Sequence, residues 1–331
     1  MSELALAAFA ADTGSHVVRA PRDRAFRVFA RWFDEAGYLA RLRESGVRWI
    51  ARSASDFPPL LHAIHDPPAG LFVRGEAGLD VLRRATVAVV GARSCSPYGA
   101  QVARMLGREL ARAGLVVVSG LARGIDGEAH RGALESDGRT VAVLGCGVDR
   151  DYPAAHAELA RAILAGGGLV VSEYEPGVEP APWRFPARNR IIAGLAAATV
   201  VVEARGRSGA LITADFALED GREVLAVPGE ITSALSAGTN ALLRQGATPA
   251  TCVADVLEAV GLEASPPATV DPDDPSAVAV LAALAAGSTT ADGLVRATGL
   301  AAGDVATALT LLELAGRVAV EEGVVRSTIA R

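Results

Sequence analysis

The chain has 331 residues, of which half are apolar, 21% are charged and 5% are aromatic. This composition fits one large domain with one or two small ones, and it predicts a core built mainly from Ala, Val and Leu. The net charge of −6 excludes a protein coated in positive charge, so any nucleic-acid surface must be a local patch.

The N-terminal part predicts a tail followed by a small helical domain. Residues 1–16 are rich in Ala and Leu and predict a tail or a short helix. Residues 17–60 contain AFRVFARWF and YLARLRESG, which are typical of short helices, with helices expected over 22–54. The proline-broken stretch DFPPLLHAIHDPPAGLFVRG should be largely extended.

Residues 61–261 repeat short apolar runs that each end at Gly, Ser, Glu, Ala or Pro. Continuous Val and Leu runs predict strands buried on both faces, and the helical patterns between them predict an α/β fold with a doubly wound, mostly parallel sheet. Ligands of such sheets bind beyond the carboxyl ends of the strands. The predicted strands are TVAVVG (86–91), LVVVSG (115–120), TVAVLG (140–145), LVVSE (169–173), TVVVEA (199–204) and EVLAVPG (223–229).

The C-terminal part predicts a linker and a winged helix. Residues 262–276 are rich in Pro and Asp and predict the linker. Residues 277–331 predict three helices and a two-stranded wing. The third helix, AAGDVATALTLLELAG, has no arginine and carries two acids, Asp304 and Glu313. Because acids repel phosphates, we interpret this domain as a protein-contact or regulatory module.

Charge and cysteine usage narrow the function classes further. Residues 1–60 carry nine arginines against seven acids, whereas residues 251–331 carry four arginines against eleven acids. The cysteines, Cys95, Cys146 and Cys252, have no metal-ligand spacing and suggest no disulfide framework. No signal-peptide pattern and no apolar run of membrane-spanning length is present, so we expect a cytoplasmic protein with no membrane span.

Two motifs at strand ends are candidate anion sites. GARSCSPYG offers a tight turn at Gly91, a cation at Arg93 and the free amides of a helix start, although a plain turn with a surface arginine explains it equally well. SGLARGIDGEAH ends a strand at Ser119 and Gly120. Its Asp126 and His130 lie four residues apart, and a hydrogen-bonded pair that fastens the loop is favoured over an acid and base pair.

Two further motifs carry the aromatic and guanidinium groups that hold single strands. FPARNRIIAGL places a phenylalanine before two arginines and an asparagine, with another arginine just upstream. The alternative is a helix cap with salt bridges, in which the last arginine is structural. Later, EARGRSG offers Ser208 and Gly209 at a helix start, with a structural turn as an equal alternative. The residues of the first of these motifs are Arg184, Phe185, Arg188, Asn189 and Arg190.

These stretches, in this order and spacing, resemble the DNA-processing protein A (DprA, or Smf) family over about residues 56–250. The resemblance also rests on TVAVLGCGVDRDYP, SEYEPG and GTNALLRQGA. It implies an extended Rossmann domain that binds single-stranded DNA, with SAM-like N-terminal helices and a C-terminal winged helix. It places the DNA pocket on Gly91, Arg93, Ser119, Gly120, Phe185, Arg188, Asn189 and Arg190. Members often have a lysine just upstream of the phenylalanine, where this sequence has Arg184.

The resemblance also implies a role. Such proteins form homodimers, protect incoming single strands and help load the RecA recombinase in natural transformation and recombination. We therefore expect a DNA-binding protein with no catalytic residue, cofactor or metal. One alternative is a Rossmann-type nucleotide sensor or nucleotide-processing enzyme, although the PGGxGTxxE signature of phosphoribohydrolases is missing. A winged-helix transcription regulator is disfavoured by the acidic third helix.

Overall fold

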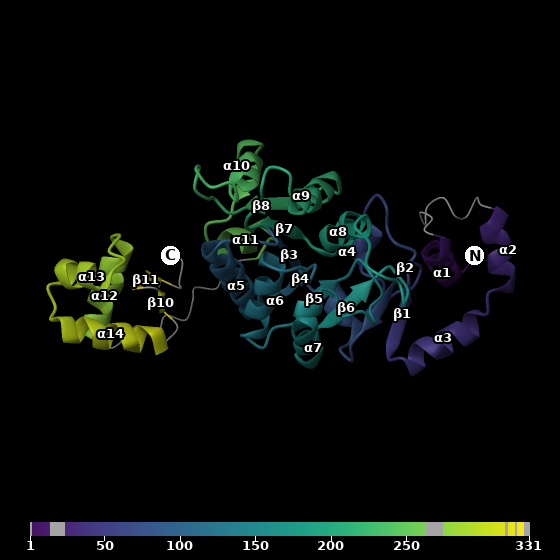
Figure 1. The fold of residues 1–331 in the computed structure, drawn as a ribbon, viewed down its shortest axis with the longest axis horizontal. Coiled ribbons are helices and arrows are strands. Elements are labelled where there is room, and N and C mark those ends of the chain that lie inside the picture. The colour runs from purple at the N-terminus through teal and green to yellow at the C-terminus, as the bar shows by residue number, and fades with distance from the viewer. Residues whose placement is uncertain (1, 14–23, 263–273, 315–316, 322, 328–331) are drawn as a thin grey trace. The chain divides into compact units, whose positions relative to one another are not determined.

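The protein forms two compact units, Met1–Ala264 and Ser265–Arg331, in a computed structural model. The structure describes residues 2–13, 24–262, 274–314, 317–321 and 323–327. A nine-stranded sheet forms the centre of the larger unit (Figure 1). Its strand order is β1-β2-β6-β5-β4-β3-β7-β8-β9, which confirms the doubly wound, mostly parallel fold.

All six predicted strands are present and run parallel to one another. Each is buried along almost its whole length, as the continuous Val and Leu runs predicted. The strands are β3 (Thr86–Val90), β4 (Val116–Ser119), β5 (Thr140–Val143), β6 (Leu169–Ser172), β7 (Ala198–Val201) and β8 (Glu223–Ala226).

Three further strands extend the sheet. β9 (Thr248–Pro249) is parallel to β8, whereas β2 (Gly70–Arg74) is antiparallel to both β6 and β1 (Val47–Ala51). The expectation of helix over residues 22–54 is therefore wrong for residues 47–51. The reason is tertiary, because this segment pairs residue by residue with β2 and its Trp49 ring lies 4.6 Å from the ring of Phe72.

The N-terminal helices are α1 (Glu3–Thr13), α2 (Arg24–Trp32) and α3 (Glu35–Glu44). Residues 3–13 are thus not a tail, because Leu4 and Phe9 on α1 are buried. α2 and α3 match the short helices expected there. Their SAM-like character and the boundary at residue 60 stay predictions.

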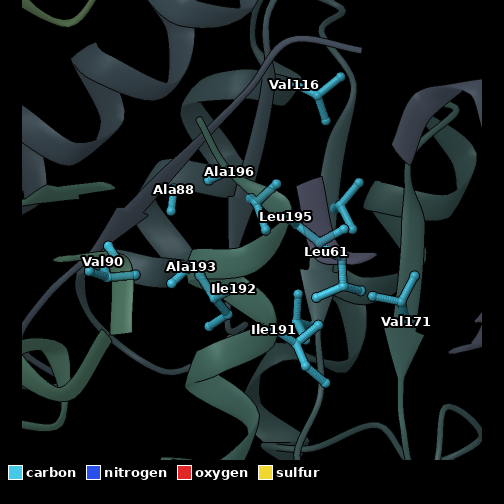
Figure 2. Close-up of a cluster of buried hydrophobic side chains, with 14 of the residues drawn as sticks. Leu61, Ala88, Val90, Val116, Val171, Ile191, Ile192, Ala193, Leu195 and Ala196 are labelled. Atoms are coloured by element: carbon cyan, nitrogen blue, oxygen red, sulfur yellow. The ribbon is translucent and has the colours of Figure 1, made fainter. Parts of the chain in front are cut away.

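Two helical layers cover the sheet. α4 (Pro59–His62), α8 (Arg184–Leu195), α9 (Gly209–Glu219) and α10 (Ala237–Arg244) share one core, and α5 (Pro97–Arg112), α6 (Ile125–Leu134) and α11 (Val253–Ala259) share another. α7 (Ala157–Ala165) packs on β5 and β6. Alternate residues of β3 serve the two cores, and Figure 2 shows Ala88 and Val90 on the side of α8.

The smaller unit confirms the winged-helix pattern. It contains α12 (Pro275–Ala285), α13 (Ala291–Thr298), α14 (Ala302–Leu314) and an antiparallel wing of β10 (Val318–Glu321) and β11 (Val324–Ser327). Most of the predicted linker lies outside the described residues. Within the described chain, no single helix is long and apolar enough to cross a membrane, and α13 with α14 reaches that length only as a pair bent by 114°.

Candidate nucleic-acid interface

The candidate site lies where the parallel strands end. The chain leaves β3 towards β4 on one side of the sheet and returns to β7 on the other, so the strand order reverses between β3 and β7. Loops that follow β3, β4, β5, β6 and β7 meet at this edge, together with the N-terminal turn of α8. In doubly wound sheets this is the place where ligands bind.

The N-terminus of α5, which the sequence predicted as a phosphate site, already has a carboxylate beside it. Glu203, which follows β7, is buried and accepts hydrogen bonds from the backbone amide and the hydroxyl of Ser96, the N-cap of α5. A side chain on Gly99 would collide with this carboxylate at 2.4 Å. The expectation of free amides at this helix start is therefore wrong, because Glu203 occupies the position that favours negative charge.

An exposed cation and two aromatic rings meet at the edge. Arg93, in the loop after β3, holds its guanidinium 5.3 Å from the ring centroid of Phe185 on α8. Phe185 also stacks on Tyr152, which follows β5, with ring centroids 5.4 Å apart and planes inclined by 22°. Tyr152 is 40% exposed. Arginine over an aromatic face is a favourable contact that a nucleobase can also make.

A second cation and ring cluster adjoins the first. The guanidinium of Arg184 lies 5.2 Å from the ring centroid of Tyr174 and 4.9 Å from that of Trp183. The two rings meet edge to face at 6.4 Å, and Trp183 is 52% exposed. Arg184, which the sequence predicted as an additional anion contact, precedes Phe185 in the chain, so the two clusters adjoin.

Arg188 has a structural environment. It is buried and donates hydrogen bonds to the carbonyl oxygens of Gly120, at 2.9 Å, and of Val143. Burial, partly offset by the charge of Asp126 and assisted by that of Arg93, lowers the pKa of Arg188 to about 10. Asp126 in turn accepts a bond from the Gly120 amide at 3.1 Å. The buried Arg188 is thus committed to fastening the loop after β4.

Arg190 also has internal partners. Both its terminal nitrogens bond the carboxylate of Glu173, at 2.7 and 2.6 Å, and its Nε lies 3.1 Å from Asp66 Oδ2. Asn189 donates to the Gly209 carbonyl oxygen at 3.0 Å, which ties α8 to the start of α9. These are the salt-bridged, structural contacts that sequence left open for Arg190.

The remaining predicted residues shape the backbone. Ser119 is buried and donates to the Val89 carbonyl oxygen at 2.6 Å, and Gly91 would meet Ile125 at 2.6 Å if it carried a side chain. Ser208 caps α9 by accepting from the amide of Ala210 at 3.3 Å, whereas Gly209 is exposed with open space around it.

Several residues at this edge were not predicted as site residues from the sequence. Arg123 after β4 and Arg207 after β7 are exposed, and no ion pair to either is present among the described residues. The signal for Arg123 was its place four residues beyond the end of β4 and beside Gly124. Tyr152 and Glu203 gave no signal of their own. No group of three or more potential metal ligands occurs in the described part of the chain.

Comparison with known proteins identifies the family. The profile described as DNA recombination-mediator protein A matches residues 48–261, and the profile described as DprA winged helix domain matches residues 264–323. The chain belongs to the DNA recombination-mediator protein A family. This confirms the resemblance, and residues 48–261 of the family domain include every predicted site residue.

Relatives of this recombination-mediator family support the assignment. Protein Smf of Escherichia coli is 45% identical over 220 residues, which are 66% of this chain and 58% of that protein. The solved structure of DNA processing protein A from Streptococcus pneumoniae is 38% identical, covers 78% of this chain and 92% of its own, and has a TM-score of 0.64. The one from Helicobacter pylori is 30% identical, covers 64% and 94%, has a TM-score of 0.57, and is described by a single-stranded DNA binding mode.

Proposed function

We propose that the chain binds single-stranded DNA at the carboxyl edge of the sheet. The observation that carries this proposal is the contact of the exposed Arg93 with Phe185, beside the exposed ring of Tyr152. An aromatic face next to a guanidinium suits a base and its phosphate together. The similarity to the Helicobacter pylori protein, whose structure is described by a single-stranded DNA binding mode, supports the same conclusion.

The mechanism divides the predicted residues into two roles. A base that stacks on Phe185 competes with Arg93 for that ring, so the guanidinium turns from the ring to the phosphate as the strand enters. Arg184 and the exposed Arg123 and Arg207 add cations along the edge. Buried Arg188, Asn189 and Arg190 act through α8, which they hold in place. Because the protein contacts the phosphates and the faces of the bases, binding is tolerant of DNA sequence and weakens with salt.

Family membership also supports a proposal about a further role. We propose that the protein acts by binding rather than by catalysis, in the cytoplasm, and that a homodimer protects the strand and helps load the RecA recombinase. Two copies on one strand raise the effective affinity for long DNA without any new contact. The acidic winged helix supports a role in contacting protein rather than phosphate.

Fluorescence anisotropy of a labelled oligo-dT at low and moderate salt tests this proposal. We expect tight binding that weakens with salt, together with weaker binding of duplex DNA, whose bases cannot stack on Phe185. Competition by free mononucleotides separates the alternative. Displacement of the oligonucleotide by a small excess of one mononucleotide, or its turnover, would favour the nucleotide sensor or nucleotide-processing enzyme.

A further inference from the structure

Helix α2 carries an exposed basic and aromatic face outside the candidate site. Arg24, Arg27 and Arg31 are exposed and follow each other at helical spacing, so they form one stripe along α2. Val28 and Trp32 lie next to the stripe and are 57% and 79% exposed. α2 contains no acid, and no ion pair to these three arginines is present among the described residues.

The opposite face of α2 is already packed. Phe26 is fully buried, and its ring meets Phe9 of α1 at 5.4 Å, while Phe29 meets the same ring at 5.5 Å. The apolar side of the helix therefore contributes to the protein core. The exposed face of α2 consists mainly of charged side chains, so it is not an apolar surface that lacks a packing partner.

A continuous set of contacts joins α2 to the outer end of the candidate site. The ring of Phe33 lies 5.4 Å from Phe29 on one side and 5.4 Å from Tyr38 of α3 on the other. The Tyr38 hydroxyl donates to Glu175, which follows Tyr174, the ring beneath Arg184. Burial and the Glu175 hydrogen bond raise the pKa of Tyr38, so this hydroxyl stays a donor at neutral pH. The guanidinium of Arg41 lies 5.4 Å from the Tyr38 ring and adds a cation along this route.

We propose that the exposed face of α2 is a second contact for the same single strand, which reaches it after leaving the Phe185 and Arg184 clusters. The arginine stripe meets phosphates and Trp32 stacks on a base. This inference rests on the proposed function. A membrane surface fits less well, because an interfacial helix needs a broad exposed apolar face and the apolar face of α2 is packed against α1.

The test compares two strand lengths, with Arg27→Ala/Arg31→Ala as the variant. Oligo-dT of about six nucleotides is short enough to occupy a single binding site, whereas a strand of about thirty nucleotides can cover both surfaces. A matched control, Arg112→Ala/Arg161→Ala, removes two exposed arginines from α5 and α7. We expect the variant to bind the short strand like the wild type and the long strand about tenfold more weakly. Its slope of log affinity against log salt should fall by about 1.4, because each lost phosphate contact contributes about 0.7.

Trp32→Ala supplies an independent reading. We expect it to weaken long-strand binding at least about fivefold, with recovery in Trp32→Phe, since a ring restores stacking. Long-strand affinity and salt slope equal to the wild type in both variants would overturn the inference while leaving the proposed function intact. Failure of the wild type to bind either strand would overturn both. Loss of binding to anionic phospholipid vesicles, with unchanged DNA binding, would instead assign α2 to a membrane.

Discussion

Arg190 and Glu173 form a bidentate ion pair inside the larger unit, in which Nη1 donates to Oε1 and Nη2 donates to Oε2. The side chains are only 10% and 8% exposed. Arg190→Ala leaves the Glu173 carboxylate buried without its partner, so we expect the free energy of unfolding in urea to fall by about 3–5 kcal/mol. Arg84→Ala, which breaks the exposed pair with Asp80, is the control and should change it by less than about 1 kcal/mol. Equal changes in the free energy of unfolding would show that the buried pair stabilises the protein no more than the exposed pair does.

Alanine substitutions at Gly120 and Gly209 distinguish the effect of a steric clash from the effect of replacing a glycine. A methyl group on Gly120 would lie 2.5 Å from the guanidinium of Arg188 and 2.7 Å from Asp126, whereas Gly209 has nothing within 4 Å. We expect Gly120→Ala to lower the free energy of unfolding by about 1–3 kcal/mol and to weaken oligo-dT binding, because Arg188 must move. Gly209→Ala should leave both quantities unchanged. Tolerance of alanine at Gly120 would refute the fastening role of Arg188.

We expect the buried His130 to make the protein less stable in mild acid. Burial, together with the charges of His156, Arg188 and Arg131, lowers its pKa to about 3. The folded protein therefore keeps this imidazole neutral, while the unfolded chain protonates it near its ordinary pKa of 6.5. The contribution is complete above about pH 6.5 and is lost as the pH falls towards 3, at up to about 1.4 kcal/mol per unit.

Urea unfolding at pH 7, 6 and 5 measures this contribution. In His130→Gln the fall in stability with acid should be shallower than in the wild type. His65→Gln replaces an exposed histidine and serves as the control, with a profile that follows the wild type. A His130 variant that keeps the full acid dependence would assign that dependence to other groups.

The winged helix should be dispensable for DNA affinity. The smaller unit has its own buried core, and the larger unit contains the whole candidate site. Deletion of residues 265–331 should therefore leave a folded protein with oligo-dT affinity within about twofold of the full chain at moderate salt, because the segment is acidic and repels phosphate. A tenfold loss of affinity would mean that the winged helix contacts the strand, contrary to our interpretation of its third helix.

Local sequence pattern predicted most of the sheet. The six central strands are continuous apolar runs, and burial on both faces is the condition that produces such runs. β1 and β9 escaped prediction because their signal is not local. Val47–Ala51 contains Arg48 and follows a helix, and it becomes a strand only by pairing with β2. β9 has two residues and depends on β8.

The sequence predicted where the candidate site lies better than it predicted the role of each residue in it. Strand ends and residue chemistry selected Arg93 and Phe185, which the structure brings together. The same reasoning could not distinguish the exposed Arg93 from the buried Arg190, because the acids that pair with Arg190 come from distant segments. Likewise, the occupant of the α5 helix start is Glu203, 107 residues away from Ser96.

Photocrosslinking of an iodouracil-substituted oligo-dT, followed by peptide mass spectrometry, identifies the side chains that the single strand contacts. We expect crosslinks to Phe185 and Tyr152, the rings that meet at the carboxyl edge of the sheet. These crosslinks should be lost in Arg93→Ala under conditions where Arg112→Ala keeps them. Crosslinks confined to the winged helix, or unchanged in Arg93→Ala, would mean that the strand does not bind at the carboxyl edge of the sheet.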